Sequence, residues 1–201
     1  MAKSATRPSV FICASAIGFY GERGDETVDE TSPPGSGFLP EVCMKWEAAA
    51  GPAAEAGIRT VHLRTGIVLS TDGGALQKML PPFKMGGGGV IGSGRQYMSW
   101  IHIEDEVEAI RFVMQDSSIS GPVNLTAPQP VTNREFTQVL GRVLHRPTIL
   151  PLPAFAVKML FGEMGEELLL GSTRAVPKKL ADAGYPFRYA ELPAALEALL
   201  K

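Results

Sequence analysis

The chain has 201 residues, 45% of them hydrophobic and 20% charged, so it can bury a core as one domain or slightly more. A formal charge of -2 disfavours nucleic acid and anionic membrane surfaces as partners. Cys13 and Cys43 are the only cysteines, too few for a disulfide framework, which favours a reducing compartment. The 22 glycines and 16 prolines form no low-complexity tract and therefore predict turns or a lined site.

The first part of the chain predicts a strand, a long loop, a helix and a second strand. Residues 9–14 are continuously apolar, which is typical of a strand covered on both faces. Residues 21–37 form a polar loop, a helix is expected from Phe38 to Gly57, and residues 59–64 predict the second strand. Such a unit connects two parallel strands through a right-handed crossover.

Shorter elements are expected in the rest of the chain. They are a helix at 75–83, strand-forming residues at 90–103, a helix from Glu104, a strand at 122–126, and a helix that begins at a capping box of Thr132 and Glu135. Residues 150–201 are helical and proline-punctuated. We therefore expect a main domain of residues 1–149 and a small helical domain of residues 150–201.

The amino-terminal residues also permit a secretory signal, because Lys3 and Arg7 precede the apolar run and Ala14-Ser15-Ala16 has small residues in the pattern of a cleavage site. Ser15 and Gly18 interrupt that run, which favours a short buried strand. No stretch approaches the roughly 20 apolar residues of a membrane span. The expected location is cytoplasmic.

Most motifs with a known chemistry are missing. Gly87, Gly89 and Gly92 match G-x-G-x-x-G, but they do not lie between a strand and a helix, so we do not interpret them as a pyrophosphate cradle. No phosphate-binding lysine loop, zinc-type spacing or nucleophile elbow occurs, and no metal site is predicted. His102 lies between a strand and a helix, where it either faces a cleft or fixes the local backbone.

Several ordered motifs carry a resemblance to a known family. They are Ala14–Gly21, Trp46–Ala49, Leu63–Leu69, Ser99–Asp105 and Val123–Pro128. In these motifs the chain resembles the second half of an extended short-chain dehydrogenase/reductase, and more narrowly the atypical branch called epimerase family proteins, which are similar to sugar-nucleotide epimerases. The tail from Leu150 to Phe187 resembles that branch's small C-terminal domain of unknown function.

The resemblance implies an α/β fold: the C-terminal part of a Rossmann-like parallel sheet with a mainly helical substrate lobe. It implies NADP(H) as cofactor and a small-molecule substrate. The residues to which it assigns roles are Ser15 as a remnant of the catalytic serine, Arg64, Thr65, Gly66, Ile67 and Val68 at the nicotinamide end of the cofactor, and Arg95, Trp100 and His102 at the substrate. The alternative for Arg64–Val68 is a plain turn at a strand end.

The chain departs from the family pattern in its catalytic and phosphate-binding residues. The short-chain dehydrogenase tyrosine and lysine fall at about Leu39 and Cys43, neither of which can shuttle a proton. Met98 stands where sugar-nucleotide epimerases carry a phosphate-binding arginine, which argues against a nucleotide-sugar substrate. Ser15 is therefore a weak catalytic candidate. The register would also allow Ala16 at the serine position, and Tyr20 and Lys45 are the nearest residues of the missing types.

The family's first half, with its glycine-rich phosphate loop, has no counterpart in the sequence. We expect weak or no NADP(H) affinity for this chain alone, and an open edge on the strand at residues 10–14 that a complementing amino-terminal half or a second copy could cover. The resulting hypothesis is an NADP(H)-dependent oxidoreductase or epimerase-like protein acting on an unidentified small molecule, incomplete as this chain. The alternative is a non-catalytic binding or interaction module derived from that family.

Overall fold

A computed structural model of the chain describes residues 7–155, 157, 159 and 169–201. The strands are β1 (Val10–Ala16), β2 (Thr27–Val28), β3 (Arg59–Thr65), β4 (Ile67–Leu69), β5 (Tyr97–Met98), β6 (Trp100–His102), β7 (Gly121–Leu125), β8 (Val131–Thr132) and β9 (Arg174–Ala175). The helices are η1 (Ile17–Tyr20), α1 (Phe38–Ala49), α2 (Gly51–Glu55), α3 (Gly74–Lys84), α4 (Ile103–Gln115), α5 (Asn133–Leu144), α7 (Lys178–Asp182) and α8 (Leu192–Leu200).

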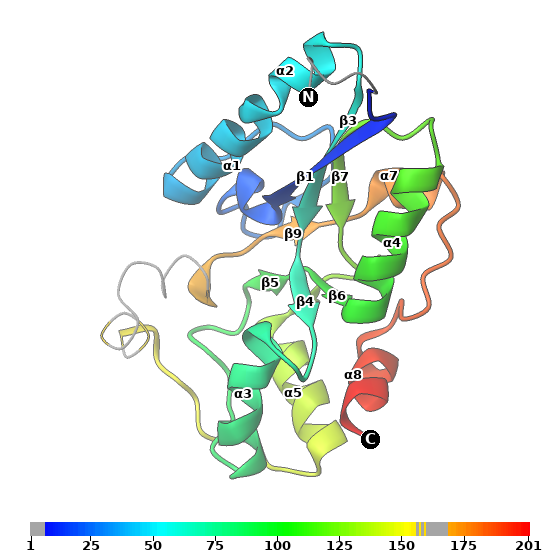
Figure 1. Ribbon diagram of the computed structural model, residues 1–201. Helices are drawn as coiled ribbons and strands as arrows, with labels where there is room; N and C mark the ends of the chain where they lie inside the picture. Colours follow the sequence, from blue (N-terminus) through cyan, green and yellow to red (C-terminus); the bar gives the residue numbers. More distant parts are fainter. Residues whose placement is uncertain (1–6, 156, 158, 160–168) are drawn as a thin grey trace.

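The upper half of the molecule in Figure 1 is a parallel sheet with the strand order β1-β3-β7. The predicted parallel pairing is confirmed, with Cys13 opposite His62. One face packs its apolar residues against α4, where Val61 and Leu63 meet Ala109 and Val113 in a buried core. Helices α1 and α2 cover the opposite face (Figure 1).

Two expectations for this half were wrong in detail. The helix expected from Phe38 to Gly57 is two helices separated at Ala50, because Pro52 has no amide to continue the hydrogen-bond ladder. The first strand, expected to be covered on both faces, is only partly covered: Val10 to Cys13 are half-buried and Ala14 is exposed, and β1 is an edge of the described sheet.

The lower half in Figure 1 is built around Trp100. Strands β4 and β6 pair in parallel, strands β5 and β8 pair antiparallel, and α3, α5 and α8 surround them. The capping box of Thr132 and Glu135 is confirmed at the start of α5, where it satisfies otherwise unpaired amides of the first turn. Phe136 and Leu196 bring α5 and α8 into the core that contains Trp100.

The C-terminal segment joins both halves. Strand β9 crosses the middle of the molecule (Figure 1) and pairs in parallel with β2, with Thr27 opposite Arg174. The Ser99 hydroxyl, which lies between β5 and β6, donates to the carbonyl of Thr173, and the Ala175 amide donates back to that hydroxyl. The described part of residues 150–201 therefore packs on the sheet and on the lower half, and the domain boundary at residue 150 stays a prediction.

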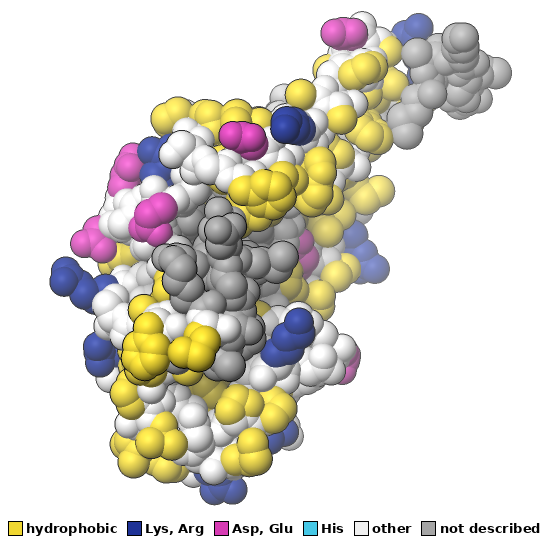
Figure 2. Space-filling view, turned by 90° about the vertical axis from the view of Figure 1, so that its left-hand side faces the viewer, with side chains coloured by type: hydrophobic (Ala, Val, Ile, Leu, Met, Phe, Trp, Pro, Cys, Tyr) yellow, Lys and Arg dark blue, Asp and Glu magenta, His cyan; other side chains and the backbone are white. Residues whose placement is uncertain are grey.

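The surface is mixed in character. Figure 2 shows the face that carries α1 and α3, where hydrophobic and charged side chains are interspersed. Phe38 and Trp46 on α1 are 68% and 53% exposed. Among the helices of the described residues, none is long and apolar enough to cross a membrane.

Candidate functional site

The carboxyl ends of β1, β3 and β7 meet in the middle of the molecule, below the sheet in Figure 1. Ligands of open parallel α/β sheets bind at such ends because the loops there diverge from the strands. Three polar or turn segments lie here: η1 after β1, the Thr65–Gly66 turn after β3, and Thr126 after β7. Strand β9 passes across the same region and takes a hydrogen bond from the Thr126 hydroxyl at the Ala175 carbonyl.

Arg64 is the centre of a buried polar network at this position. Its side chain donates hydrogen bonds to both carboxylate oxygens of Glu47 on α1, from Nε at 2.8 Å and from Nη2 at 2.9 Å. Its Cζ lies 3.4 Å from the centre of the Phe19 ring, a cation–π contact. Arg64 is only 3% exposed, so in this arrangement its guanidinium is committed to the protein itself.

Ser15 and Tyr20 complete the network. The Ser15 hydroxyl donates to Glu47 at 2.8 Å, and the Tyr20 hydroxyl accepts from Arg64 at 3.1 Å and donates to Asn124 at 2.7 Å. Burial opposes ionisation of Glu47, but the hydrogen bonds from Arg64 and Ser15 outweigh it and lower the pKa of the carboxyl. Burial raises the pKa of Tyr20 in spite of the neighbouring arginine, so this tyrosine is held as a neutral phenol.

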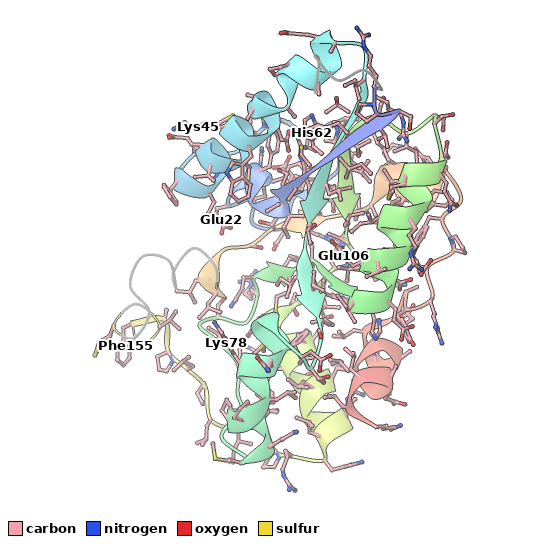
Figure 3. All side chains as sticks on the ribbon, viewed as in Figure 1. Glu22, Lys45, His62, Lys78, Glu106 and Phe155 are labelled. Carbon is pink, nitrogen blue, oxygen red and sulfur yellow. The ribbon has the colours of Figure 1, made fainter. Side chains whose placement is uncertain are left out.

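A second polar pair joins the end of β3 to α4: the partly buried Thr65 contacts Glu106, which lies on the α4 side of the sheet (Figure 3). The Thr65 hydroxyl donates to Oε1 of Glu106 at 3.0 Å, and Oε2 of Glu106 is buried with no hydrogen-bond partner among the described residues. Glu106 is 8% exposed, and burial raises its pKa to about 7. This residue was missed from the sequence, because the neighbouring Glu104 and Asp105 make it look like one more acidic residue of a helix's first turn.

Gly66 is required by the protein's own backbone. A Cβ at this position would lie 2.5 Å from the Ser99 carbonyl oxygen and 2.9 Å from a methyl carbon of Thr126. The next two residues, Ile67 and Val68, are partly buried and pack against the lower and upper cores respectively. The assignment of the segment from Arg64 to Val68 to cofactor binding therefore stays a prediction, while the contacts it makes are internal ones.

The three residues expected at the substrate, Arg95, Trp100 and His102, do not form a group of solvent-accessible side chains. Trp100 is completely buried and donates from Nε1 to the Gln129 carbonyl at 3.1 Å. His102 is also buried, caps α4 by accepting from the Glu104 amide at Nδ1, and stacks on Tyr189 at 3.8 Å. These contacts agree with the local-backbone alternative for His102.

Burial lowers the pKa of His102, so the ring stays neutral and suits its role as an acceptor at the cap. Arg95 is exposed, and among the described residues its side chain makes no hydrogen bond or ion pair. The glycines at 87, 89 and 92 follow α3 and lead toward β5 rather than joining a strand to a helix. The described residues hold no cluster of three or more His, Cys, Asp or Glu side chains that could bind a metal ion.

The fold and the position of the site identify the structural class of this protein, and the sequence comparisons then identify its family. The chain has the parallel α/β architecture of NAD(P)-binding epimerase structures. It aligns with the crystal structure of human epimerase family protein SDR39U1 (isoform 2) with NADPH at a TM-score of 0.92 and 35% identity, covering 98% of this chain and 67% of that one.

The chain belongs to the epimerase family represented by SDR39U1. It is 39% identical to mouse epimerase family protein SDR39U1, covering 97% of this chain and 67% of the mouse protein. It is 50% identical to epimerase family protein Mb2239 of Mycobacterium bovis over 94% of this chain, and residues 152–199 match a domain of unknown function, DUF1731. These matches confirm the resemblance to the epimerase family and to its C-terminal domain.

The matched relatives are longer than this chain. The chain spans only 62% of the Mycobacterium bovis relative, although nearly all of the chain takes part in the alignment. The activity, substrate and partners of the whole protein are therefore matters for proposal.

Proposed function

We propose that these 201 residues form the substrate side of an NADP(H)-dependent oxidoreductase or epimerase-like enzyme that acts on a small molecule. The observation that carries this proposal is the similarity, at a TM-score of 0.92, to a human relative crystallised with NADPH. The carboxyl ends of three parallel strands, with turns and polar groups gathered beside them, supply the position where such a ligand would lie.

The residues of this chain fit one end of such a cofactor. Ala16, Ile17 and Gly18 are apolar and partly exposed at the end of β1, which suits the face of a flat ring. Among the described residues, no glycine-rich turn joins a strand to a helix in the way a pyrophosphate requires. NADP(H), when bound, supplies a hydride; the chain's own residues would support the ring and exclude water around it.

We further propose that the phosphate end is held by polypeptide outside these residues, in the same or a separate chain. Strand β1 leaves one edge of the described sheet open, and unpaired strand edges invite pairing. Phe38 and Trp46 expose further apolar surface on α1, the helix that packs against β1. A complementing amino-terminal half would cover this edge; a second copy of the chain is the other occupant.

A non-catalytic module is favoured by one specific observation. Leu39 and Cys43 stand where a short-chain dehydrogenase places its tyrosine and lysine, and the nearest phenol, Tyr20, is buried with a raised pKa and two internal hydrogen bonds. A proton shuttle near neutral pH needs a lowered tyrosine pKa. The module would keep the fold and bind its ligand without turning it over.

Titration with NADPH, followed by the change in its fluorescence, tests the proposal. The chain alone is expected to bind weakly or not at all, and a fusion with the part of the Mycobacterium bovis relative that this chain does not cover is expected to bind with micromolar affinity. A fusion that folds but does not bind NADPH would contradict the cofactor assignment. Micromolar binding by the chain alone would contradict the division of the site between two pieces of polypeptide.

The genomic sequence upstream of Met1 separates the enzyme from the module without purified protein. A strand followed by a glycine-rich phosphate loop, in frame, supports the enzyme. A stop codon preceded by unrelated sequence supports the module. Oxidation of NADPH by the fusion in the presence of small carbonyl compounds then tests turnover directly.

A further inference from the structure

Arg174 is a partly buried cation with unmet hydrogen-bonding capacity. Its Cζ lies 4.7 Å from the centre of the Tyr97 ring, so the guanidinium rests on an aromatic face. Its Nε is buried and has no hydrogen-bond partner within the part of the chain that the structure describes. Among the described residues, its guanidinium makes no hydrogen bond or ion pair. A buried donor without a partner carries a desolvation cost that protein structures normally avoid.

The position of Arg174 places this donor at the ligand-binding end of the sheet. Arg174 lies on β9, which crosses the middle of the molecule between the two halves (Figure 1). The next residue, Ala175, is fully buried and bonds to Ser99 and Thr126, the two residues that crowd the Gly66 turn. The Arg174 side chain, by contrast, places its guanidinium over the ring of Tyr97 on β5.

The carboxylate of Glu22, which accepts from the amide of Ser172 two residues before Arg174, makes no ion pair with Arg174. Glu22 lies below α1 (Figure 3), and its two oxygens accept from the backbone amides of Gly24 and Ser172. Arg64 shows the contrast, because its guanidinium is paired with both oxygens of Glu47. Arg95, two residues before Tyr97, adds an exposed positive charge on the same segment.

We propose that Arg174, supported on the ring of Tyr97, binds an oxyanion of the substrate, either a carboxylate or a phosphate. A guanidinium presents parallel N–H groups that match two oxygens of either anion, and stacking on a ring fixes its plane. An incoming anion would give the buried Nε the acceptor that the protein does not provide. This inference rests on the proposed function, because it assigns a substrate class to the same end of the sheet.

Thermal unfolding of the chain, titrated with inorganic pyrophosphate in one arm and malonate in the other at constant ionic strength, tests the inference. The wild-type melting temperature is expected to rise with at least one of the two anions, and the arm that responds identifies phosphate or carboxylate. Arg174→Gln is expected to weaken the binding of that anion by about ten- to a hundredfold, which is the usual contribution of a hydrogen bond to a charged group. Arg174→Lys keeps the charge but loses the planar guanidinium. It is expected to bind the anion with an affinity between those of the wild type and Arg174→Gln.

Arg142→Gln, on the exposed end of α5, is the matched control and should leave the anion titration unchanged. An unfolded Arg174→Gln variant would leave Arg174→Lys and Tyr97→Leu to carry the test, each with weaker anion binding expected. No protection of the wild type by either anion, or protection that survives every substitution at Arg174, would overturn the inference. NADPH titration of the fusion is an independent measurement, so the loss of the proposed function and the loss of this anion site give different results.

Discussion

Glu106 allows the sharpest test of the buried site. Its carboxyl has a pKa raised from 4.5 to about 7 by burial, and the one hydrogen bond that it accepts from the described residues comes from Thr65. Below pH 4.5 the residue is protonated in both the folded and the unfolded chain, so its burial does not lower the free energy of unfolding. Between pH 4.5 and 7 the folded state binds the extra proton, so stability falls as the pH rises. Above pH 7 the full cost of a buried charge is present.

The magnitude follows from the shift. A difference of about 2.5 pKa units corresponds to about 3 kcal/mol at 1.36 kcal/mol per unit. Glu106→Gln mimics the protonated acid and can still accept from Thr65 through its amide oxygen. The variant is therefore expected to be more stable than the wild type by up to about 3 kcal/mol at pH 8 and equally stable at pH 4.

Urea denaturation at pH 4, 5, 6, 7 and 8, followed by tryptophan fluorescence, measures these free energies of unfolding. Trp100 is buried in the folded chain, so its emission reports the transition. Glu108→Gln, on the exposed face of the same helix, is the control and should change stability by less than about 0.5 kcal/mol. The reasoning would be refuted if Glu106→Gln were no more stable than the wild type at pH 8, or if its advantage did not shrink as the pH fell.

Three further substitutions test other parts of the site by denaturation at pH 7. Arg64→Met leaves the Glu47 carboxylate buried without its cation and should cost about 3–5 kcal/mol; a loss below 1 kcal/mol would contradict a tight ion pair. Gly66→Ala presses a methyl group against the Ser99 carbonyl and should cost about 1–3 kcal/mol, so an unchanged melting temperature would argue against this close approach. His102→Ala removes the cap of α4 and should cost about 1 kcal/mol or more, whereas His102→Asn should retain part of it; equal losses would rule out capping.

Local patterns predicted a large part of the fold. The capping box of Thr132 and Glu135 specifies a helix start through two hydrogen bonds within four residues, and the structure contains both. The apolar run at residues 9–14 and the strand-forming segment at 59–64 predicted adjacent parallel strands, and β1 and β3 pair over their whole length. Such features depend on neighbours in sequence, so they can be recognised without the tertiary structure.

The roles of the site residues depend on partners far away in sequence. Arg64 on β3 was expected beside a cofactor, yet its guanidinium bonds to Glu47, which lies 17 residues earlier on helix α1. His102 was left between a cleft and a backbone role, and only the packing of Tyr189 against its ring shows that it is enclosed. No periodicity in the sequence reports which helix will lie over which strand.

The sequence by itself determined the family, the strand and helix pattern and the departures at Leu39, Cys43 and Met98, because these are properties of residue order. Only the tertiary structure decided which charges are paired. It paired Arg64 with Glu47 and placed Glu106 and Arg174 near the ends of the strands. There one oxygen of Glu106 and one nitrogen of Arg174 are buried without a partner from residues 7–155, 157, 159 and 169–201. The physical reason is that burial and pairing set the energy of a charged group, and both arise only when distant segments pack together.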